Sequence, residues 1–361
     1  MAHGKAMAGV PLLPTTVVGS YPVPEWMERL KTDYYRGRMS LAQLTDVHEM
    51  AIKAALRDQE LAGIDIVSDG ELRRDNDIDY FLARTPGIRL AETSKDFSFD
   101  YYDATLPAPL PGSFDAPPLR LADDYAFTAS QTSAPIKFSF TGPFSLSRRV
   151  RDEAYRDDRE LVRALARMLN AEARALAERG ATLLQIDEPF LAGYPDQVVT
   201  AIEAINVVTE GVDVTWALHV CYGNRYARPL WEGHYDFLFP AVLDTTVDQL
   251  VLEFARKGQE DLPVVRKFGW DRDLGLGVLD VKSAEVETPE LIANRIRNAL
   301  ELVPADRLVV NPDCGLRNLT GAVARAKLAA MVEGTAAVRR ELGPATDSTS
   351  TPITEPLAQG A

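Results

Sequence analysis

Residues 181–222 read ATLLQIDEPFLAGYPDQVVTAIEAINVVTEGVDVTWALHVCY and contain two short apolar runs with a helical pattern between them. The first run, 181–189, and the second, 214–222, have the length and composition of buried strands. The segment near 195–209 has the apolar spacing of a helix. Near-continuous apolar strands joined through a helix are typical of a parallel sheet that helices cover. This stretch therefore predicts one β/α unit of a parallel α/β fold.

The same unit recurs along the chain. Further β-rich runs lie at 15–20, 64–71, 136–143, 249–255, 274–281 and 307–315. Helical patterns lie at 40–62, which opens with Ser40 as a helix N-cap, and at about 157–179, 288–302 and 319–341. Eight strands that mostly alternate with helices predict a single (β/α)8 TIM barrel.

One region interrupts the alternation. Residues 80–134 are rich in Asp, Pro, Tyr and Phe and show no clear helical pattern. We expect them to form an inserted, short antiparallel excursion beside the barrel mouth. The expected organisation is a flexible N-terminus at 1–13, a catalytic barrel at 14–341 that includes this insertion, and a disordered tail at 342–361, which is small, polar and proline-containing.

Composition restricts the function classes. The chain of 361 residues has a formal net charge of −14, which argues against a nucleic-acid-binding face and against an anionic membrane surface. We therefore expect neither nucleic acid nor membrane among its partners. No run approaches the roughly 18 apolar residues of a membrane-spanning helix, and no signal peptide is recognisable. Two cysteines cannot build a disulfide framework, which favours a reducing, cytoplasmic location.

Unusual polar residues gather where the expected strands end. In a barrel, the carboxyl ends of all strands meet at one rim, and barrel enzymes place their chemistry there. We therefore expect distant parts of the chain to share one pocket. The strand ends carry Ser20, Asp69, Glu71, Asp187, Glu188, His219, Cys221, Glu253, Asp313 and Cys314.

The pair His219 and Cys221 suggests a metal site. Residues two apart on a strand point to the same face, so both side chains point inward while Val220 faces the helices. Together with Cys314, they supply two sulfurs and one nitrogen, which are three ligands of a zinc site with an open fourth position. Three other interpretations stay open: small buried cysteines, a Cys221–Cys314 disulfide, and a cysteine nucleophile with His219 as its base.

Seven motifs occur along the chain: TTVVGSYP (15–22), SDGELRRDND (68–77), FTGPFSL (140–146), LQIDEPF (184–190), HVCY (219–222), LGLGVLDVKS (274–283) and NPDCGL (311–316). Together and in this order they resemble the catalytic barrel of cobalamin-independent methionine synthase. The resemblance covers most of residues 14–335, and the motifs together are more specific than any one alone.

The resemblance implies a zinc-dependent methyltransferase that methylates the thiol of homocysteine to form methionine. It implies zinc ligands at His219, Cys221, Glu253 and Cys314. It also implies that Ser20 holds the substrate carboxylate, while Glu71 and Asp187 hold the ammonium group. Zinc would deprotonate the incoming thiol, and two carboxylates favour a cation between them.

Each carboxylate also has an ordinary structural interpretation. Glu71 can pair with Arg73 or Arg74, Asp187 can cap a helix, and Glu253 can be a salt-bridged carboxylate.

Lys282 departs from the family pattern. The resemblance places it, with Asp187, among the catalytic residues, but folate-dependent members have a histidine at this position that is thought to protonate the leaving group. A lysine is a poorer proton donor at pH 7 unless its pKa is depressed.

The second, N-terminal barrel of those members also does not precede the catalytic barrel here, so the sequence looks more like the short core methionine synthases. The expected donor is methylcobalamin or a methyl-corrinoid protein, with methyltetrahydrofolate less favoured. Two alternatives are a zinc-dependent alkyltransferase acting on another thiol, similar to epoxyalkane:coenzyme M transferases, and a metal-free cysteine hydrolase.

Overall fold

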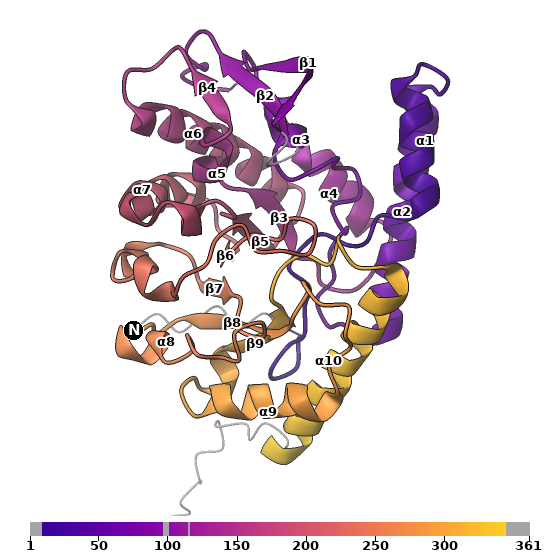
Figure 1. Ribbon diagram of the computed structural model, residues 1–361, viewed down its shortest axis with the longest axis vertical. Coiled ribbons are helices and arrows are strands. Elements are labelled where there is room, and N and C mark those ends of the chain that lie inside the picture. The colour runs from indigo at the N-terminus through magenta and orange to yellow at the C-terminus, as the bar shows by residue number, and fades with distance from the viewer. Residues whose placement is uncertain (1–8, 97–100, 115, 344–361) are drawn as a thin grey trace, which may run out of the picture.

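A computed structural model describes residues 9–96, 101–114 and 116–343. Six parallel strands form the central sheet in the order β3–β5–β6–β7–β8–β9, with helices arranged around them (Figure 1). Their bounds are β3 Phe138–Thr141, β5 Leu183–Asp187, β6 Thr215–Val220, β7 Gln249–Leu252, β8 Asp273–Leu279 and β9 Leu308–Pro312. All six coincide with strands that the sequence predicts.

Three short bridges complete the ring of strands. Thr15 pairs with Val310 of β9, Thr16 pairs with Ile66, and Val67 pairs with Ile136 next to β3, all in parallel. The backbone amide of Thr16 donates to the carbonyl of Val310 over 2.9 Å, and that of Ile66 to the carbonyl of Thr15 over 3.0 Å. The first two predicted strands thus take their expected places, although each is reduced to a bridge, and the barrel prediction is confirmed.

Five long helices match the predicted ones to within three residues at each end. They are α2 (Leu41–Ala62), α6 (Asp158–Glu178), α7 (Val198–Thr209), α9 (Pro289–Leu300) and α10 (Gly321–Leu342). Around the outside, α2 contacts α10, α10 contacts α9, and α6 contacts α7. Shorter helices are α1 (Glu25–Tyr35), α3 (Asp79–Leu82), α4 (Leu121–Ala129), α5 (Pro143–Ser147) and α8 (Val264–Lys267). No helix among the described residues is both long and apolar enough to cross a bilayer.

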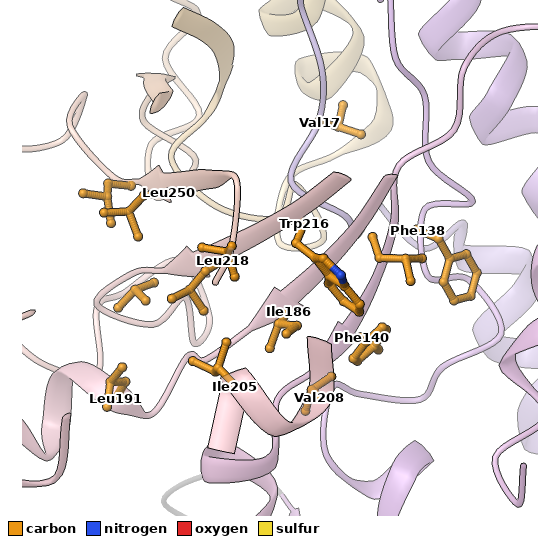
Figure 2. Close-up of a cluster of buried hydrophobic side chains, with 14 of the residues drawn as sticks. Val17, Phe138, Phe140, Ile186, Leu191, Ile205, Val208, Trp216, Leu218 and Leu250 are labelled. Carbon is orange, nitrogen blue, oxygen red and sulfur yellow. The ribbon is translucent and has the colours of Figure 1, made fainter. Parts of the chain in front are cut away.

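The two faces of the strands pack differently. Outward-facing Ile186, Leu218 and Leu250 belong to the large apolar cluster that also includes Ile205 and Val208 of α7 (Figure 2). The intervening positions turn inward, where Val18, Ala217 and Val251 form a small apolar cluster of their own. Because side chains alternate along a strand, polar residues at the remaining inward positions reach the barrel interior and its mouth.

The insertion contains a hairpin. β1 (Arg89–Asp96) pairs antiparallel with β2 (Tyr101–Leu106), and β2 pairs parallel with β4 (Val150–Asp152). This matches the expected antiparallel excursion. The expectation that the region lacks a helix is wrong, because α4 forms within it and buries Leu121 and Tyr125. α4 packs against α6, and this tertiary contact stabilises a helix too short to be recognised by its apolar spacing.

The ends of the chain are only partly described. Of the expected flexible start, residues 1–8 lie outside the described residues, but Leu13 is fully buried and its carbonyl accepts a hydrogen bond from Arg339. The packed chain therefore begins earlier than predicted. Of the expected tail, 344–361 lies outside the described residues.

Candidate active site

Three predicted metal ligands converge at the carboxyl ends of β6 and β9. His219 lies in β6, Cys221 follows β6, and Cys314 follows β9. The ligand nitrogen of His219 and the two sulfurs all lie within 4.8 Å of one another. The sulfurs are 3.5 Å apart, well beyond the roughly 2.05 Å of a disulfide bond, and both cysteines are free. The disulfide interpretation is therefore wrong for this structure.

The imidazole of His219 is oriented as in a metal site. Its Nδ1 donates a hydrogen bond to the carbonyl oxygen of Val251 over 3.2 Å. Its Nε2 is buried and has no hydrogen-bond partner among the described residues. With the proton on Nδ1, the lone pair of Nε2 is available to a ligand, and such a backbone bond commonly fixes the tautomer of a metal-binding histidine.

The cysteine pair favours a bound cation. The neighbouring Cys221 and burial raise the pKa of the Cys314 thiol well above its ordinary value. Two thiolates this close would repel each other in a buried site, so a compensating positive charge is needed to ionise both. A buried imidazole nitrogen and two sulfurs therefore fit a divalent metal that prefers nitrogen and sulfur ligands, such as zinc.

Glu253 is not part of this group of three. It directly follows β7 and is buried. Its Oε2 accepts from Nζ of Lys282 over 2.7 Å, and its Oε1 accepts from Nε of Arg256 over 2.8 Å. The structure thus shows the salt-bridged arrangement that was one of the interpretations of this residue.

Lys282 is held in the charged form. Burial alone would lower its pKa, but the Glu253 carboxylate outweighs that effect and the pKa of Lys282 is raised. A proton donor at neutral pH needs the opposite shift. The catalytic role of Lys282 therefore stays a prediction, and its side chain is not among those that line the cavity described next.

The three predicted substrate-binding residues share a single cavity with the three predicted metal ligands His219, Cys221 and Cys314, which are called the metal group below. Its volume is about 210 Å³, and its walls include Ser20, Glu71, Asp187, His219, Cys221 and Cys314. Two glycines give these side chains room. A Cβ atom at position 19 would lie 2.2 Å from Oε1 of Glu71, and one at position 315 would lie 2.0 Å from Oγ of Ser20.

Glu71 is held by three neighbours. Its backbone is in the left-handed region with φ of 57°, and its amide donates to Oδ1 of Asp69 over 2.9 Å. Its Oε1 accepts from Oγ of Ser139 over 2.7 Å and lies 3.2 Å from Nη1 of Arg74. Of the two arginines that the sequence offered as partners, Arg74 forms the ion pair.

Asp187 has little neutralisation of its charge. Its Oδ1 accepts from Nε2 of Gln185 over 2.6 Å. Burial raises the pKa of Asp187 to about 7; the nearby His219 opposes this shift and Glu71 adds to it. A cationic group placed beside Glu71 and Asp187 would offset both the burial of the Asp187 charge and its repulsion by Glu71. This part of the cavity therefore favours an ammonium group.

Glu188, rather than Asp187, caps a helix. Its carboxylate accepts from the backbone amides of Phe144 and Ser145, at 3.1 and 2.7 Å, and so caps the start of α5. Asp313 has a similar supporting role, since it accepts from the amides of Phe254, Ala255 and Arg256 and fixes the loop after Glu253. The sequence shows that both carboxylates lie at strand ends. Their role in supporting neighbouring loops could be recognised only from the tertiary structure.

Several cavity residues were not predicted. Asn76 and Asp77 close the motif SDGELRRDND and could have been found there, whereas Tyr101 comes from the insertion and has no sequence signal. Tyr101 donates to Oδ1 of Asp77 over 2.7 Å, which joins the hairpin to the cavity wall. The other unpredicted lining residues include Phe190, Arg225, Tyr226, Leu230, Arg317 and Asn318.

Comparison with known proteins agrees with this geometry. A family model described as cobalamin-independent synthase, catalytic domain, matches residues 13–337. The methionine synthase of Saccharolobus solfataricus is 36% identical over 337 residues, which cover 93% of this chain and 98% of that protein. The solved structure of a B12-independent methionine synthase from Shewanella sp. W3-18-1, in complex with selenomethionine, has a TM-score of 0.80 and 28% identity, covering 92% of this chain and 99% of that one. The chain therefore belongs to the cobalamin-independent methionine synthase family.

Proposed function

We propose that this protein transfers a methyl group to the sulfur of homocysteine and releases methionine, with zinc held by His219, Cys221 and Cys314. One observation carries the proposal: a single small cavity joins a soft nitrogen–sulfur ligand set to two carboxylates, Glu71 and Asp187. Family membership supports methionine synthesis, and the selenomethionine complex of the Shewanella relative supports an amino acid of this size as the occupant.

Different residues of the cavity bind different groups of the substrate. Glu71 and Asp187 attract its ammonium group, and the hydroxyl of Ser20 binds its carboxylate. The sulfur end of the substrate then faces His219, Cys221 and Cys314, which line the same cavity. Zinc bound by these three side chains would lower the pKa of the substrate thiol and make a thiolate available at neutral pH.

Glu253 is our proposed fourth metal ligand, on the strength of the family resemblance. Lys282 and Arg256 engage both of its carboxylate oxygens, so coordination by Glu253 requires at least one of these ion pairs to open. The same two cations can accept the carboxylate again when the substrate sulfur takes the fourth position.

We further propose a methylated corrinoid as the methyl donor. The carbon–cobalt bond of the donor breaks as the carbon–sulfur bond forms, and cobalt keeps the electron pair, so the leaving group needs no proton. A folate donor instead leaves an amine that needs one, and Lys282, which pairs with Glu253 in this structure, has a raised pKa. The family description includes cobalamin independence, so methyltetrahydrofolate is the competing donor.

The test is a direct assay of zinc-loaded protein. Homocysteine is incubated with methylcobalamin or with methyltetrahydrofolate, and methionine is measured. We expect product with methylcobalamin. Product from methyltetrahydrofolate alone would overturn the donor proposal. Methylation of coenzyme M but not of homocysteine would overturn the substrate, although Glu71 and Asp187 disfavour its sulfonate.

A ligand variant tests the metal assignment. Cys314→Ala should lose bound zinc on dialysis and lose at least about 100-fold in activity, since even residues that only orient metal ligands typically cost 10–100-fold. His234→Ala is the matched control, because His234 pairs with Asp261 at 2.6 Å, its side chain is 63% exposed, and it does not line the cavity. Full methyl transfer by a zinc-free protein would overturn the metal assignment, and hydrolysis by such a protein would support the cysteine-hydrolase class.

A further inference from the structure

The cavity has room for the amino acid but not for a donor as well. Pockets that enclose a drug-sized ligand typically measure about 300–1,000 Å³, and this one measures about 210 Å³. On the proposed function, on which this inference rests, homocysteine occupies that space. The ring system that carries the methyl group must therefore stay at the mouth of the cavity and present the methyl group inward.

A short hairpin at residues 225–228 stands at this mouth. Arg225 and Arg228 form an antiparallel bridge, with backbone hydrogen bonds of 2.8 and 2.9 Å between them. The two residues between them, Tyr226 and Ala227, both have positive φ, 48° and 58°. Tight hairpins of this kind favour Asn-Gly, because other side chains are disfavoured in the left-handed region. A tyrosine and an alanine at these positions therefore weaken the turn.

The hairpin is anchored to segments next to the metal group. The side-chain amide of Asn224 donates to the carbonyl of Gly315 over 3.0 Å, and Asn318 donates to the carbonyl of Asn224 over 2.8 Å. Asn224 lies three residues after Cys221, and Gly315 lies directly after Cys314. These bonds fix the position of the turn relative to the proposed zinc ligands, and they help to hold its disfavoured backbone.

Tyr226 is an exposed aromatic residue of this turn. It is 67% exposed, yet it lines the cavity, and the guanidinium carbon of Arg225 lies 4.7 Å from the centre of its ring. Tyr101 and Phe190, whose ring centres are 6.2 Å apart, provide further aromatic surface in the lining. An aromatic side chain that is largely exposed on a disfavoured backbone buries little apolar surface, and such backbone outliers concentrate where ligands bind.

We propose that the hairpin tip is the docking element for the methyl donor and that Tyr226 stacks against the conjugated ring system of that donor. A corrin and a reduced pterin share this chemistry, because the corrin ring and the pyrimidine ring of the pterin are both conjugated and offer a face on which an aromatic side chain can stack. The two sources are separated by the arms of the experiment below. The tyrosine is a donor-binding residue and takes no part in homocysteine binding.

The experiment compares Tyr226→Ala, Tyr226→Phe and wild type as zinc-loaded proteins. Equilibrium dialysis measures binding of methylcobalamin and of methyltetrahydrofolate separately, and steady-state kinetics give KM for the donor and for homocysteine. Loss of one aromatic stacking partner should weaken donor binding and raise donor KM by about 5- to 100-fold. Homocysteine KM should change by less than about twofold, and Tyr226→Phe should behave as wild type.

Tyr35→Ala is the matched control, because Tyr35 is 65% exposed but lies in α1 and does not line the cavity. It should leave both KM values unchanged. Tyr226→Gly should raise the melting temperature by relieving the turn, while weakening donor binding as Tyr226→Ala does.

Three outcomes overturn the inference. They are unchanged donor binding in Tyr226→Ala, equal weakening of donor and homocysteine binding, and a wild-type protein that binds neither donor. Failure of the proposed function is distinct, because donor that binds wild type and is lost from Tyr226→Ala supports the hairpin even when no methionine forms.

Discussion

The lysine side chain of Lys137 is buried inside the protein. It directly precedes β3, is 1% exposed, and its Nζ has no hydrogen-bond partner among the described residues. Burial lowers its pKa to about 7, although Asp187 and Glu71 oppose the shift. Lys137 therefore sits close enough to Glu71 and Asp187, the two carboxylates proposed to bind the substrate, to feel their charge, and its own charge state changes near neutral pH.

Replacing Lys137 with methionine should alter how stability depends on pH. Below pH 7 the lysine is charged in both the folded and the unfolded chain, and the folded chain carries the cost of a buried charge. Between pH 7 and the ordinary value of 10.5, only the unfolded chain keeps the proton, so stability rises with pH. Relative to Lys137→Met, wild type should gain about 1.4 kcal/mol per pH unit. Urea unfolding at pH 7.5, 8.5 and 9.5 measures this difference.

The variant should also be the more stable protein at pH 7, because methionine fills the space without a charge. Lys267→Met is the control, since Lys267 is exposed and pairs with Asp236 at the surface. It should leave the pH dependence unchanged. Parallel pH profiles for wild type and Lys137→Met would show that the buried lysine keeps an ordinary pKa.

Glu71→Gln tests substrate recognition. The change keeps the shape of the side chain and its bond from Ser139, but removes the charge that we propose attracts the ammonium group. A hydrogen bond to a charged group is worth about 1.5–3 kcal/mol, so homocysteine KM should rise by about 10- to 100-fold. Bound zinc should be unchanged. Glu49→Gln, which alters a carboxylate that pairs with Arg73 outside the cavity, should have no such effect.

At the scale of single residues, the sequence predicts site residues at strand ends better than site residues in loops. Ser20, Glu71 and Asp187 follow or end strands, and the parallel ring brings them into one cavity with the metal group. Tyr101 and Tyr226 were missed because each lies in a connection whose path depends on tertiary contacts. Glu253 was recognised as a strand-end carboxylate, but its ion pairs come from Arg256 and Lys282, and only the folded chain shows which partner holds it.

Helices were predictable where local signals define both ends. α2 begins at a capping box, in which Oγ of Ser40 accepts from the amide of Gln43 and the Gln43 side chain accepts from the amide of Ser40. It ends at Gly63, whose φ of 82° suits glycine. By contrast, α1 and α4 are short, and the first two barrel strands are held by single bridges, so their form depends on what packs against them.

Ser40→Ala should therefore weaken α2 by a predictable amount. Loss of an N-cap serine typically costs about 1 kcal/mol, because a helix amide loses its partner. Urea unfolding should show a lower midpoint with an unchanged slope. Asp46→Ala, at an exposed position one turn further along the same helix, should change stability by less than about 0.5 kcal/mol. Equal effects of the two variants would mean that the capping box does not stabilise the helix.

The barrel as a whole is closed by contacts between its first and last segments. Thr15 bridges to Val310 of β9, and both the amide and the hydroxyl of Thr15 donate to Oδ2 of Asp65. From α10, Arg339 reaches the same carboxylate at 2.6 Å and donates to the carbonyls of Leu12 and Leu13. These partners lie up to 327 residues apart in sequence. The alternation of strands and helices predicts the ring of strands, but it does not predict that Arg339 joins the two ends of that ring.

Arg339→Met should consequently destabilise the whole molecule and not only α10. The change removes three hydrogen bonds from a guanidinium group and leaves the Asp65 carboxylate with Thr15 as its remaining partner, which should cost about 2–4 kcal/mol of unfolding free energy. Because Arg339 joins the first and last segments of the ring, circular dichroism and zinc release should both report a lowered midpoint in urea. Arg340→Met, at the exposed neighbouring position, is the control and should stay within about 0.5 kcal/mol of wild type. An Arg339→Met protein that keeps the wild-type midpoint would show that the bridges to Val310 and Ile66 close the barrel without this arginine.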